Sequence, residues 1–346
     1  MRTSLLGADI SSRALAAVGT RLFFVTGGDT LESTVIGSGA RPETIVAGTG
    51  CDTISQIVAT GSLLGYVETA PHGFAHTPGV PVDSVDCGMR SSVTWTIWLS
   101  DLSGGHARKV ASGVRPVDST DTRMSPVRLA LTTSTYAFNR PNSPGLMATG
   151  ETIEVRSVVD DRLLWTVQSG ARVQDLILGG TSLAVLEVEP ALELSVADAV
   201  NPVLTQIAFP ASSASLSEDG QYLAWDVAAD AAHGGSSQVV TFQLHTGATS
   251  SVVVSSNAPS PTPLRPVVSS ALGGPLVAWY DTATSGIVYP GFLDPWIKAN
   301  SFFSSAEAPE WIALRGSTLI LVATDHDARH TVAFALDLSR SGFAPQ

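Results

Sequence analysis

Histidines at a spacing of four residues are the first candidates for chemistry in this sequence. They form two pairs, His72/His76 and His326/His330. On a helix this spacing would place two metal ligands on one face, but the flanking residues predict no helix. In extended chain four residues span about 13 Å, which is too far for one zinc ion to bridge. We therefore interpret these histidines as loop residues, and include His72, His76 and His326 among the candidates for a binding surface.

Acidic residues form a second candidate group, because several directly follow apolar segments that we expect to be strands. They are Asp29, Glu68, Asp226, Asp281, Asp325 and Asp327. In the fold argued below these side chains would lie near the mouth of a central channel, where carboxylates and backbone carbonyls can coordinate Ca²⁺. Asp226, Asp281 and Asp325 are the candidate ligands and binding residues, and calcium is the only cofactor that we consider. The alternative is that polar residues simply end strands that reach solvent.

The sequence contains no diagnostic catalytic or nucleotide-binding motif. A G-x-S-x-G nucleophile elbow, a P-loop and a G-x-G-x-x-G after a strand are all missing, and Gly48 and Gly50 form only a bare G-x-G. We assign no catalytic residue. Trp296, in the loop-like segment FLDPWIKAN, is a further candidate for a binding surface, whereas most other tryptophans lie in apolar segments that predict core packing.

A repeated unit supplies the elements that must position these residues. In each copy a turn residue, usually glycine, is followed three positions later by a large apolar residue that opens an apolar segment. The seven copies start at Gly19, Gly61, Thr133, Gly180, Gly220, Gly274 and Gly316. Most separations are close to the roughly 40 to 50 residues of a four-stranded propeller blade. The pattern predicts an all-β chain, a single β-propeller domain over residues 1–346 with seven four-stranded blades.

The two ends of the chain complete one unit in this scheme. The residues after Gly316 and those before Gly19 together make about one repeat length. The segment TSLLGA near the N-terminus reads as a spare strand, so we predict a closing blade from residues 305–346 plus 1–10. Such closure removes an exposed sheet edge. A β-sandwich pair, a β-helix or a different number of blades are the alternatives.

One copy of the unit resembles a known propeller repeat. The segment SEDGQYLAWD, residues 217–226, is similar to the S-x-D-G-x-x-[IL]-A-[FW] signature of TolB-like (PD40) repeats, with Glu218 in place of the usual proline. The matching residues are Ser217, Asp219, Gly220, Leu223, Ala224 and Trp225. The other units keep only the glycine and the apolar strand. The resemblance implies a propeller fold and implies no site or activity.

The longest predicted loops fall into two classes, those between second and third strands and those leading to the next blade. They are residues 68–92, 115–125, 139–152, 226–238 and 256–265. Both classes emerge on the same face of a propeller, so we expect one loop-rich face that carries binding residues. Cys51 and Cys87 fall on this face and predict a disulfide, with two unrelated thiols as the alternative. A disulfide would indicate an oxidising compartment.

Composition and charge narrow the range of partners and locations. The net charge is −12 and no basic cluster with interleaved aromatic residues is present, so nucleic acid is not an expected partner. No run of about 18 apolar residues predicts a membrane span. Asp9 and Arg13 interrupt any signal-peptide core. We expect an extracellular, periplasmic or cell-envelope location after removal of a leader, with a cytoplasmic location as the alternative.

These observations lead to two hypotheses about function. The first is a non-catalytic binding or scaffold propeller that engages a protein or a glycan through its loop-rich face. The second is a propeller enzyme of the lactonase or lyase type, with a metal at the channel mouth. The second rests on analogy between folds, because no motif supports it.

Overall fold

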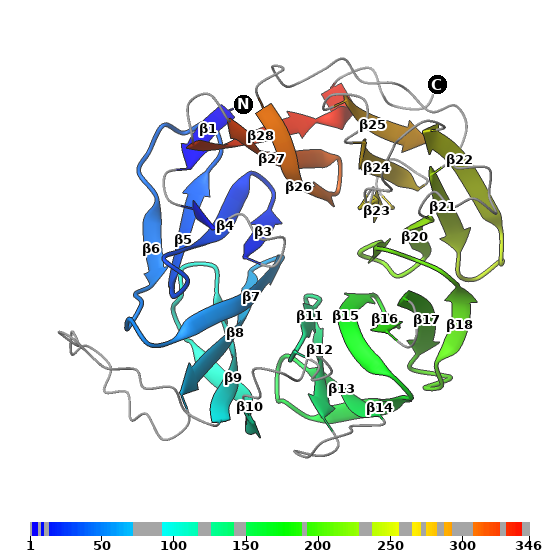
Figure 1. The fold of residues 1–346 in the computed structure, drawn as a ribbon, viewed down its shortest axis with the longest axis horizontal. Coiled ribbons are helices and arrows are strands. Elements are labelled where there is room, and N and C mark those ends of the chain that lie inside the picture. Colours follow the sequence, from blue (N-terminus) through cyan, green and yellow to red (C-terminus); the bar gives the residue numbers. More distant parts are fainter. Residues whose placement is uncertain are drawn as a thin grey trace. The chain divides into compact units, whose positions relative to one another are not determined.

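The computed structural model describes most of the chain, and the described part is all β apart from one short 3₁₀ helix, η4 (Leu338–Arg340) (Figure 1). The described residues are 2–5, 8–9, 14–71, 92–116, 126–141, 150–188, 192–227, 237–255, 265–270, 275–281, 287–292, 307–325 and 330–340. The chain divides into two compact units, Gly7–Gln174 and Asp175–Gln346 with Met1–Leu6. The single-domain organisation over residues 1–346 stays a prediction.

The unit Gly7–Gln174 contains three antiparallel sheets. The first comprises β2 (Ala8–Asp9), β3 (Leu15–Val18), β4 (Arg21–Thr26), β5 (Thr30–Val35) and β6 (Glu43–Val46). The second comprises β7 (Thr53–Thr60), β8 (Leu63–Pro71), β9 (Ser92–Asp101) and β10 (Arg108–Pro116). The third comprises β11 (Leu129–Leu131), β12 (Thr135–Pro141), β13 (Glu151–Ser157) and β14 (Leu163–Ser169). In the second and third sheets, each strand pairs with the next one along the chain.

The other unit contains four sheets, the first of which starts at the unit boundary. They are β15 (Arg172–Gly179), β16 (Ser182–Val188), β17 (Leu192–Asp198) and β18 (Thr205–Ala208); then β19 (Ala214–Leu216), β20 (Tyr222–Val227), β21 (Ser237–Gln243) and β22 (Thr249–Ser255). The third sheet is β23 (Val267–Ser269), β24 (Leu276–Asp281) and β25 (Ile287–Phe292). The last is β26 (Glu307–Arg315), β27 (Thr318–Asp325) and β28 (His330–Asp337), with β1 (Arg2–Leu5).

The chain is therefore a β-propeller of four-stranded antiparallel blades, as the repeat predicts. Six sheets have four or more strands, so six complete blades are described where seven were predicted. The sheet β23–β25 has three described strands, and residues 293–306, where a fourth strand would be expected, lie outside the described residues.

Pairing between the two ends of the chain confirms the predicted closure of the last blade. β1 runs antiparallel to β28, with Arg2 opposite Phe334 and Leu5 opposite Thr331. Leu5 is completely buried. The closing segment is shorter than the predicted residues 1–10, because Ala8 and Asp9 already pair with β4 of another sheet.

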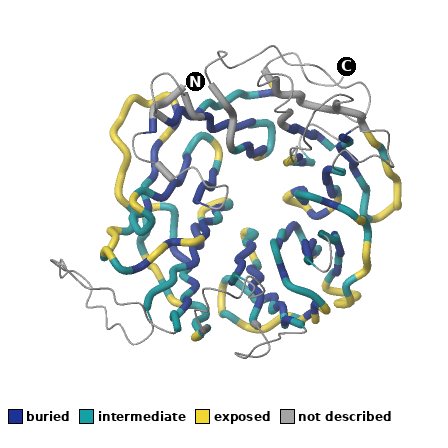
Figure 2. Tube along the Cα trace, viewed as in Figure 1, coloured by how far each residue is buried: buried dark blue, intermediate teal, exposed yellow. Residues whose placement is uncertain are grey.

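Burial along the second strand of each sheet explains the apolar segment of the repeat. In β20 the consecutive residues Leu223 and Ala224 are both fully buried, although their side chains point to opposite faces. Both faces of such a strand are therefore covered, and a run of apolar residues replaces strict alternation. In Figure 2 buried residues follow these strands, whereas exposed residues gather at turns and on outer strands such as β6 and β18.

The residues that resemble the TolB-like signature form the turn between β19 and β20. The Ser217 hydroxyl donates to Asp219 Oδ1 (2.6 Å) and accepts the N–H groups of Gln221 and Tyr222 (3.1 and 2.9 Å). Burial would raise the pKa of Asp219, but hydrogen bonds from Ser217, Gln221 and Ser270 outweigh it and hold the pKa below its usual value. The signature therefore encodes a turn and not a binding site.

Glycine is required in this turn for two reasons. Gly220 has a φ of +74°, and a Cβ there would lie 2.2 Å from the carbonyl oxygen of Gly179 in the preceding sheet. The backbone of Gly180 reinforces the contact by donating to the Glu218 carbonyl (2.9 Å). The corresponding glycines of other units also have positive φ values, namely Gly19, Gly61, Gly180 and Gly316.

Candidate functional site

The two ends of each four-stranded sheet differ in the connections that they carry. First-to-second and third-to-fourth strand connections lie at one end, which we call the hairpin end. Second-to-third strand connections and those to the next sheet lie at the other, which we call the loop-bearing end. The predicted loops 68–92, 115–125, 139–152, 226–238 and 256–265 all belong to the loop-bearing end, and most of their residues lie outside the described part of the chain.

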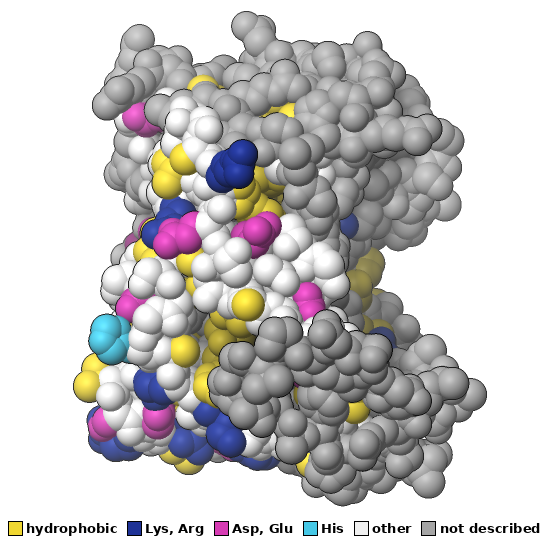
Figure 3. All heavy atoms as spheres, turned by 90° about the vertical axis from the view of Figure 1, so that its left-hand side faces the viewer, with side chains coloured by type: hydrophobic (Ala, Val, Ile, Leu, Met, Phe, Trp, Pro, Cys, Tyr) yellow, Lys and Arg dark blue, Asp and Glu magenta, His cyan; other side chains and the backbone are white. Residues whose placement is uncertain are grey.

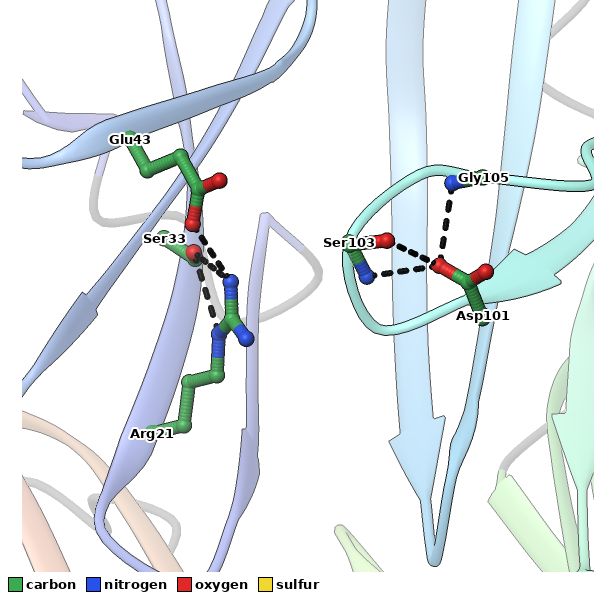
Figure 4. Close-up of polar contacts among 6 residues, drawn as sticks. All are labelled: Arg21, Ser33, Glu43, Asp101, Ser103 and Gly105. Atoms are coloured by element: carbon green, nitrogen blue, oxygen red, sulfur yellow. Dashed lines mark hydrogen bonds and ion pairs between the residues drawn. The ribbon is translucent and has the colours of Figure 1, made fainter.

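The β9–β10 turn at the hairpin end is closed by its own hydrogen bonds. Asp101 Oδ1 accepts the Ser103 amide and hydroxyl (2.8 and 2.5 Å) and the Gly105 amide (2.9 Å), as Figure 4 shows. Its other oxygen lies 3.0 Å from His106 Nδ1. The hydrogen bonds from Ser103 and His106 hold the pKa of Asp101 well below its usual range. Both oxygens of the Asp101 carboxylate therefore make contacts within the turn.

Arg21 is also paired at the hairpin end. Its guanidinium donates to Ser33 Oγ (2.8 and 3.2 Å) and to Glu43 Oε2 (2.8 Å), which joins β4, β5 and β6 (Figure 4). The side chain also lies over the Phe23 ring, 5.4 Å from its centroid. Asp101 and Arg21 therefore both use their charges in contacts within the chain.

At the loop-bearing end, Asp226 and Asn139 form the same contact in two different sheets. Asp226 Oδ1 accepts the amide and hydroxyl of Ser213 (2.6 and 3.0 Å), the residue opposite it just before β19. Asn139 Oδ1 accepts the Arg128 amide (2.5 Å) at the matching place before β11. Both side chains are buried. Each therefore fixes the point where a connection from the preceding sheet enters its own sheet.

Asp29, which follows β4, and Glu68, which lies within β8, also make internal contacts. Asp29 accepts the Gly50 amide (2.7 Å) and the Thr30 hydroxyl (3.1 Å), so its carboxylate holds the β6–β7 connection. Glu68 accepts the indole N–H of Trp98 (2.6 Å). For the acidic residues whose side chains are described, these contacts favour the structural interpretation over a calcium site.

Most of the binding and metal candidates from the sequence lie outside the described side chains. His72, His76, Cys87, Trp296, His326 and Asp327 are outside the described residues. Asp281 and Asp325 end β24 and β27, but their side chains are not described. His330, which we expected in a loop, begins β28 opposite Asp325, because the β27–β28 hairpin extends that far.

The predicted calcium site and disulfide consequently stay predictions. Within the described ranges, no group of three or more His, Cys, Asp or Glu side chains is arranged to hold a metal ion. Asp226, the one proposed ligand with a described side chain, is buried against Ser213. Cys51 lies in the β6–β7 connection, and its predicted partner Cys87 is outside the described residues. In the described part of the chain, no helix is long and apolar enough to span a membrane.

Sequence reasoning missed a group of basic and aromatic side chains between the second and third sheets of the unit Gly7–Gln174. We call Trp95, Arg115, Phe138 and Arg140 the arginine cluster. The Arg140 guanidinium carbon lies 5.8 Å from the Trp95 ring centroid and 5.5 Å from that of Phe138. Arg140 Nε donates to Glu154 Oε1 (2.9 Å), and the side chain is 42% exposed. Both arginines lie at the beginning of long predicted loops, residues 115–125 and 139–152.

Arg115 lies beside the same tryptophan. Trp95 is opposite Gly113 in the β9–β10 ladder, and its ring covers Gly113, where a Cβ would be 2.6 Å from it. Arg115 is two residues further along β10, so its side chain leaves the same face of the sheet. Arg115 Nε is buried and has no hydrogen-bond partner, and burial lowers the pKa of its guanidinium.

Four arginines lie along these facing surfaces, and three of them contact a described carboxylate. Arg140 and Arg156 share Glu154, and Arg108 contacts Asp161, which also accepts the Tyr136 hydroxyl (3.1 Å). Arg115 is left over. In Figure 3, basic side chains gather toward the lower edge of the view, interspersed with acidic ones.

Comparisons with known proteins support the fold. The sequence matches no protein-family model and is significantly similar to no curated protein sequence. The structure is similar to a chain of the mitotic checkpoint complex (TM-score 0.58, 11% identity, covering 97% of this chain and 93% of that one). It is also similar to the Pan2 WD40 domain of Neurospora crassa (0.54, 9%, covering 94% and 88%).

A further structural neighbour is TolB from Acinetobacter baumannii. The TM-score is 0.44 at 14% identity, and the match covers 89% of this chain and 60% of TolB. The resemblance to TolB-like repeats is therefore supported mainly by the Ser217–Gly220 turn. At these identities the checkpoint-complex chain and the Pan2 domain show a shared β-propeller fold and transfer no function.

Proposed function

We propose that this chain is a non-catalytic scaffold propeller that binds a partner protein through the loop-bearing ends of its sheets. One observation carries the proposal: two charged groups of the hairpin end, Asp101 and Arg21, make contacts within the chain, whereas Arg115 Nε at the loop-bearing end has no hydrogen-bond partner. Binding residues are commonly placed on connections that a rigid scaffold positions. One structurally similar chain, by its description, belongs to a protein complex.

Cross-linking mass spectrometry on complexes recovered from the native host tests this proposal. We expect cross-links between the partner and the loop-bearing connections, including residues 117–125 and 142–149. Replacing these two segments by short Gly-Ser linkers should abolish the complex, whereas the same replacement of the hairpin turn 102–107 should leave it intact. Cross-links confined to the hairpin ends, or loss of the complex only in the turn variant, would contradict the proposal.

We also propose that the protein works outside the cytoplasm, with Cys51 and Cys87 joined. Such a disulfide would tether the long connection between β8 and β9 to the β6–β7 connection. Thiol titration of the unfolded, unreduced protein should then detect no free thiol. Two titratable thiols in protein purified from its native compartment would exclude the disulfide and remove the support for this location.

The enzyme hypothesis has a separate test. A lactonase or lyase centre would need Asp226, Asp281 and Asp325 to share a calcium ion. The buried contact of Asp226 with Ser213 does not favour this. Added Ca²⁺ should therefore leave the melting temperature unchanged. A calcium-dependent rise that Asp281→Asn and Asp325→Asn abolish would favour the enzyme instead.

A further inference from the structure

Arg140 is held in one orientation by three groups. The Trp95 and Phe138 rings lie 5.8 and 5.5 Å from its guanidinium carbon, and Glu154 accepts a hydrogen bond from its Nε. Cation–π contacts and a charge-assisted hydrogen bond restrict a side chain that is otherwise highly flexible. Among the described residues, none accepts a hydrogen bond from its Nη groups. Arg140 therefore presents a fixed donor group at the loop-bearing end of β12.

Arg115 is energetically unfavourable in the chain as it stands. Its Nε is shielded from water, burial lowers the pKa of the guanidinium, and no carboxylate in the described structure pairs with it. Removing a charge from water without a partner costs free energy. The unpaired Nε of this guanidinium can donate to a carboxylate partner that the described residues do not supply.

The two arginines come from neighbouring sheets, and Trp95 links their positions. Trp95 contacts Arg140 of β12 directly, and Arg115 is the next residue of β10 on the face that the Trp95 ring covers. Neighbouring same-face positions on adjacent strands are about 7–8 Å apart, which is within reach of side chains as long as arginine and tryptophan. A single acidic segment can thus reach both guanidinium groups.

We propose that Arg115 and Arg140 anchor an acidic segment of the partner protein through its Asp or Glu side chains. The inference rests on the proposed function and adds the chemistry of the partner. Arginine binds planar carboxylates through paired hydrogen bonds. The overall charge of −12 disfavours extended polyanions such as nucleic acid. Arginine is also a frequent binding hot spot, whereas Trp95 is 3% exposed and only positions the guanidinium beside it.

Binding of a synthetic peptide array to the intact chain tests the proposal. The array contains twelve-residue peptides with none, two or four Asp or Glu residues, together with phosphoserine peptides. We expect acidic peptides to bind above neutral ones, and less well at higher salt. Arg140→Gln should weaken this binding about tenfold or more. The control Arg162→Gln, an exposed arginine beyond β13, should change it less than about twofold.

The variant Arg115→Met separates a binding role from a structural one. Methionine keeps the length of the side chain and removes the buried charge. We expect the melting temperature to stay the same or rise, while binding of the acidic peptides falls about tenfold. A lower melting temperature with unchanged peptide binding would show that Arg115 serves the fold, and would overturn the proposal. Wild-type protein that binds acidic and neutral peptides equally, or prefers only phosphopeptides, would overturn it too.

Failure here is distinguishable from failure of the proposed function. If the native complex still forms at the loop-bearing end when Arg115→Met and Arg140→Gln are combined, the scaffold proposal stands and the acidic anchor is wrong. If cross-links map to the hairpin ends, the scaffold proposal itself is wrong, whatever the peptides do.

Discussion

Asp226 and Asn139 carry out the same task with different chemical groups. Each buried side-chain oxygen accepts the backbone N–H of the residue opposite, Ser213 in one sheet and Arg128 in the other. The hydrogen bond therefore matters more than the charge. An unsatisfied buried N–H costs about 1–3 kcal/mol, which sets the scale of the expected effects.

Substitutions at Asp226 test this equivalence. Asp226→Asn keeps an acceptor and should lower the free energy of unfolding by less than about 1 kcal/mol. Asp226→Leu leaves the Ser213 N–H unpaired and should lower it by about 1–3 kcal/mol. Urea denaturation measures both. Equal losses for the two variants would show that the negative charge itself is needed, as a metal site at this position would require.

Glu154 predicts a pH dependence of stability. Burial would raise its pKa, but hydrogen bonds from Arg156 and Arg140 more than compensate, and the pKa lies below its ordinary value of 4.5. The interaction therefore stabilises the folded chain above about pH 4.5, and this contribution is lost as the pH falls below that value. The difference in melting temperature between wild type and Glu154→Gln should be large at pH 7 and shrink below pH 4.

Glu43 offers a control for this comparison, because it pairs with Arg21 while remaining 64% exposed. Glu43→Gln should change the melting temperature little at either pH, since exposed ion pairs contribute little. A wild-type advantage over Glu154→Gln that stays constant from pH 7 to pH 3 would rule out stabilisation by the ionised carboxylate.

At the scale of elements, the hairpin turn that contains Gly220 packs directly against the preceding sheet. Gly220 and Gly247 have nearly equal φ values, +74° and +71°, but differ in their surroundings. A Cβ at Gly220 would meet the Gly179 carbonyl oxygen at 2.2 Å, whereas one at Gly247 would meet nothing within 4 Å. Both substitutions to alanine carry the backbone penalty of about 1–2 kcal/mol, and only Gly220→Ala adds a backbone clash.

Denaturation of Gly220→Ala and Gly247→Ala isolates the contact between sheets. The loss of unfolding free energy for Gly220→Ala should be at least about twice that for Gly247→Ala. Equal losses would mean that the preceding sheet yields to the added methyl group, and that the turn does not fix the spacing between sheets.

The elements were predictable from the sequence because local chemistry defines them. A positive-φ glycine followed by a run of apolar residues marks the inner hairpin in most units, and the Ser217 turn is encoded within six residues. The arginine cluster was not predictable. Whether Arg115 has a partner depends on residues brought together from different strands, and its only signal is its position before a long loop. The predicted loop candidates, including His72 and Trp296, remain untested.

At the scale of the whole molecule, the pairing of β1 with β28 distinguishes a propeller from an open array of sheets. A strand from one end of the chain completes the sheet built by the other end, so that sheet does not expose β28 as a free edge. The same closure provides a stable framework for the loop-bearing ends, on which the proposed binding function depends.

An engineered disulfide measures this pairing most directly. Ser4 lies opposite Val332 in the register, and directly opposed strand residues are close enough for a disulfide. Ser4→Cys combined with Val332→Cys should form a cross-link within one chain under mild oxidation, identified by peptide mass. The control pair Ser4→Cys and Thr318→Cys, with Thr318 on β27, should not. Failure of the first pair to cross-link within the chain, or equal cross-linking of both pairs, would contradict closure by β1.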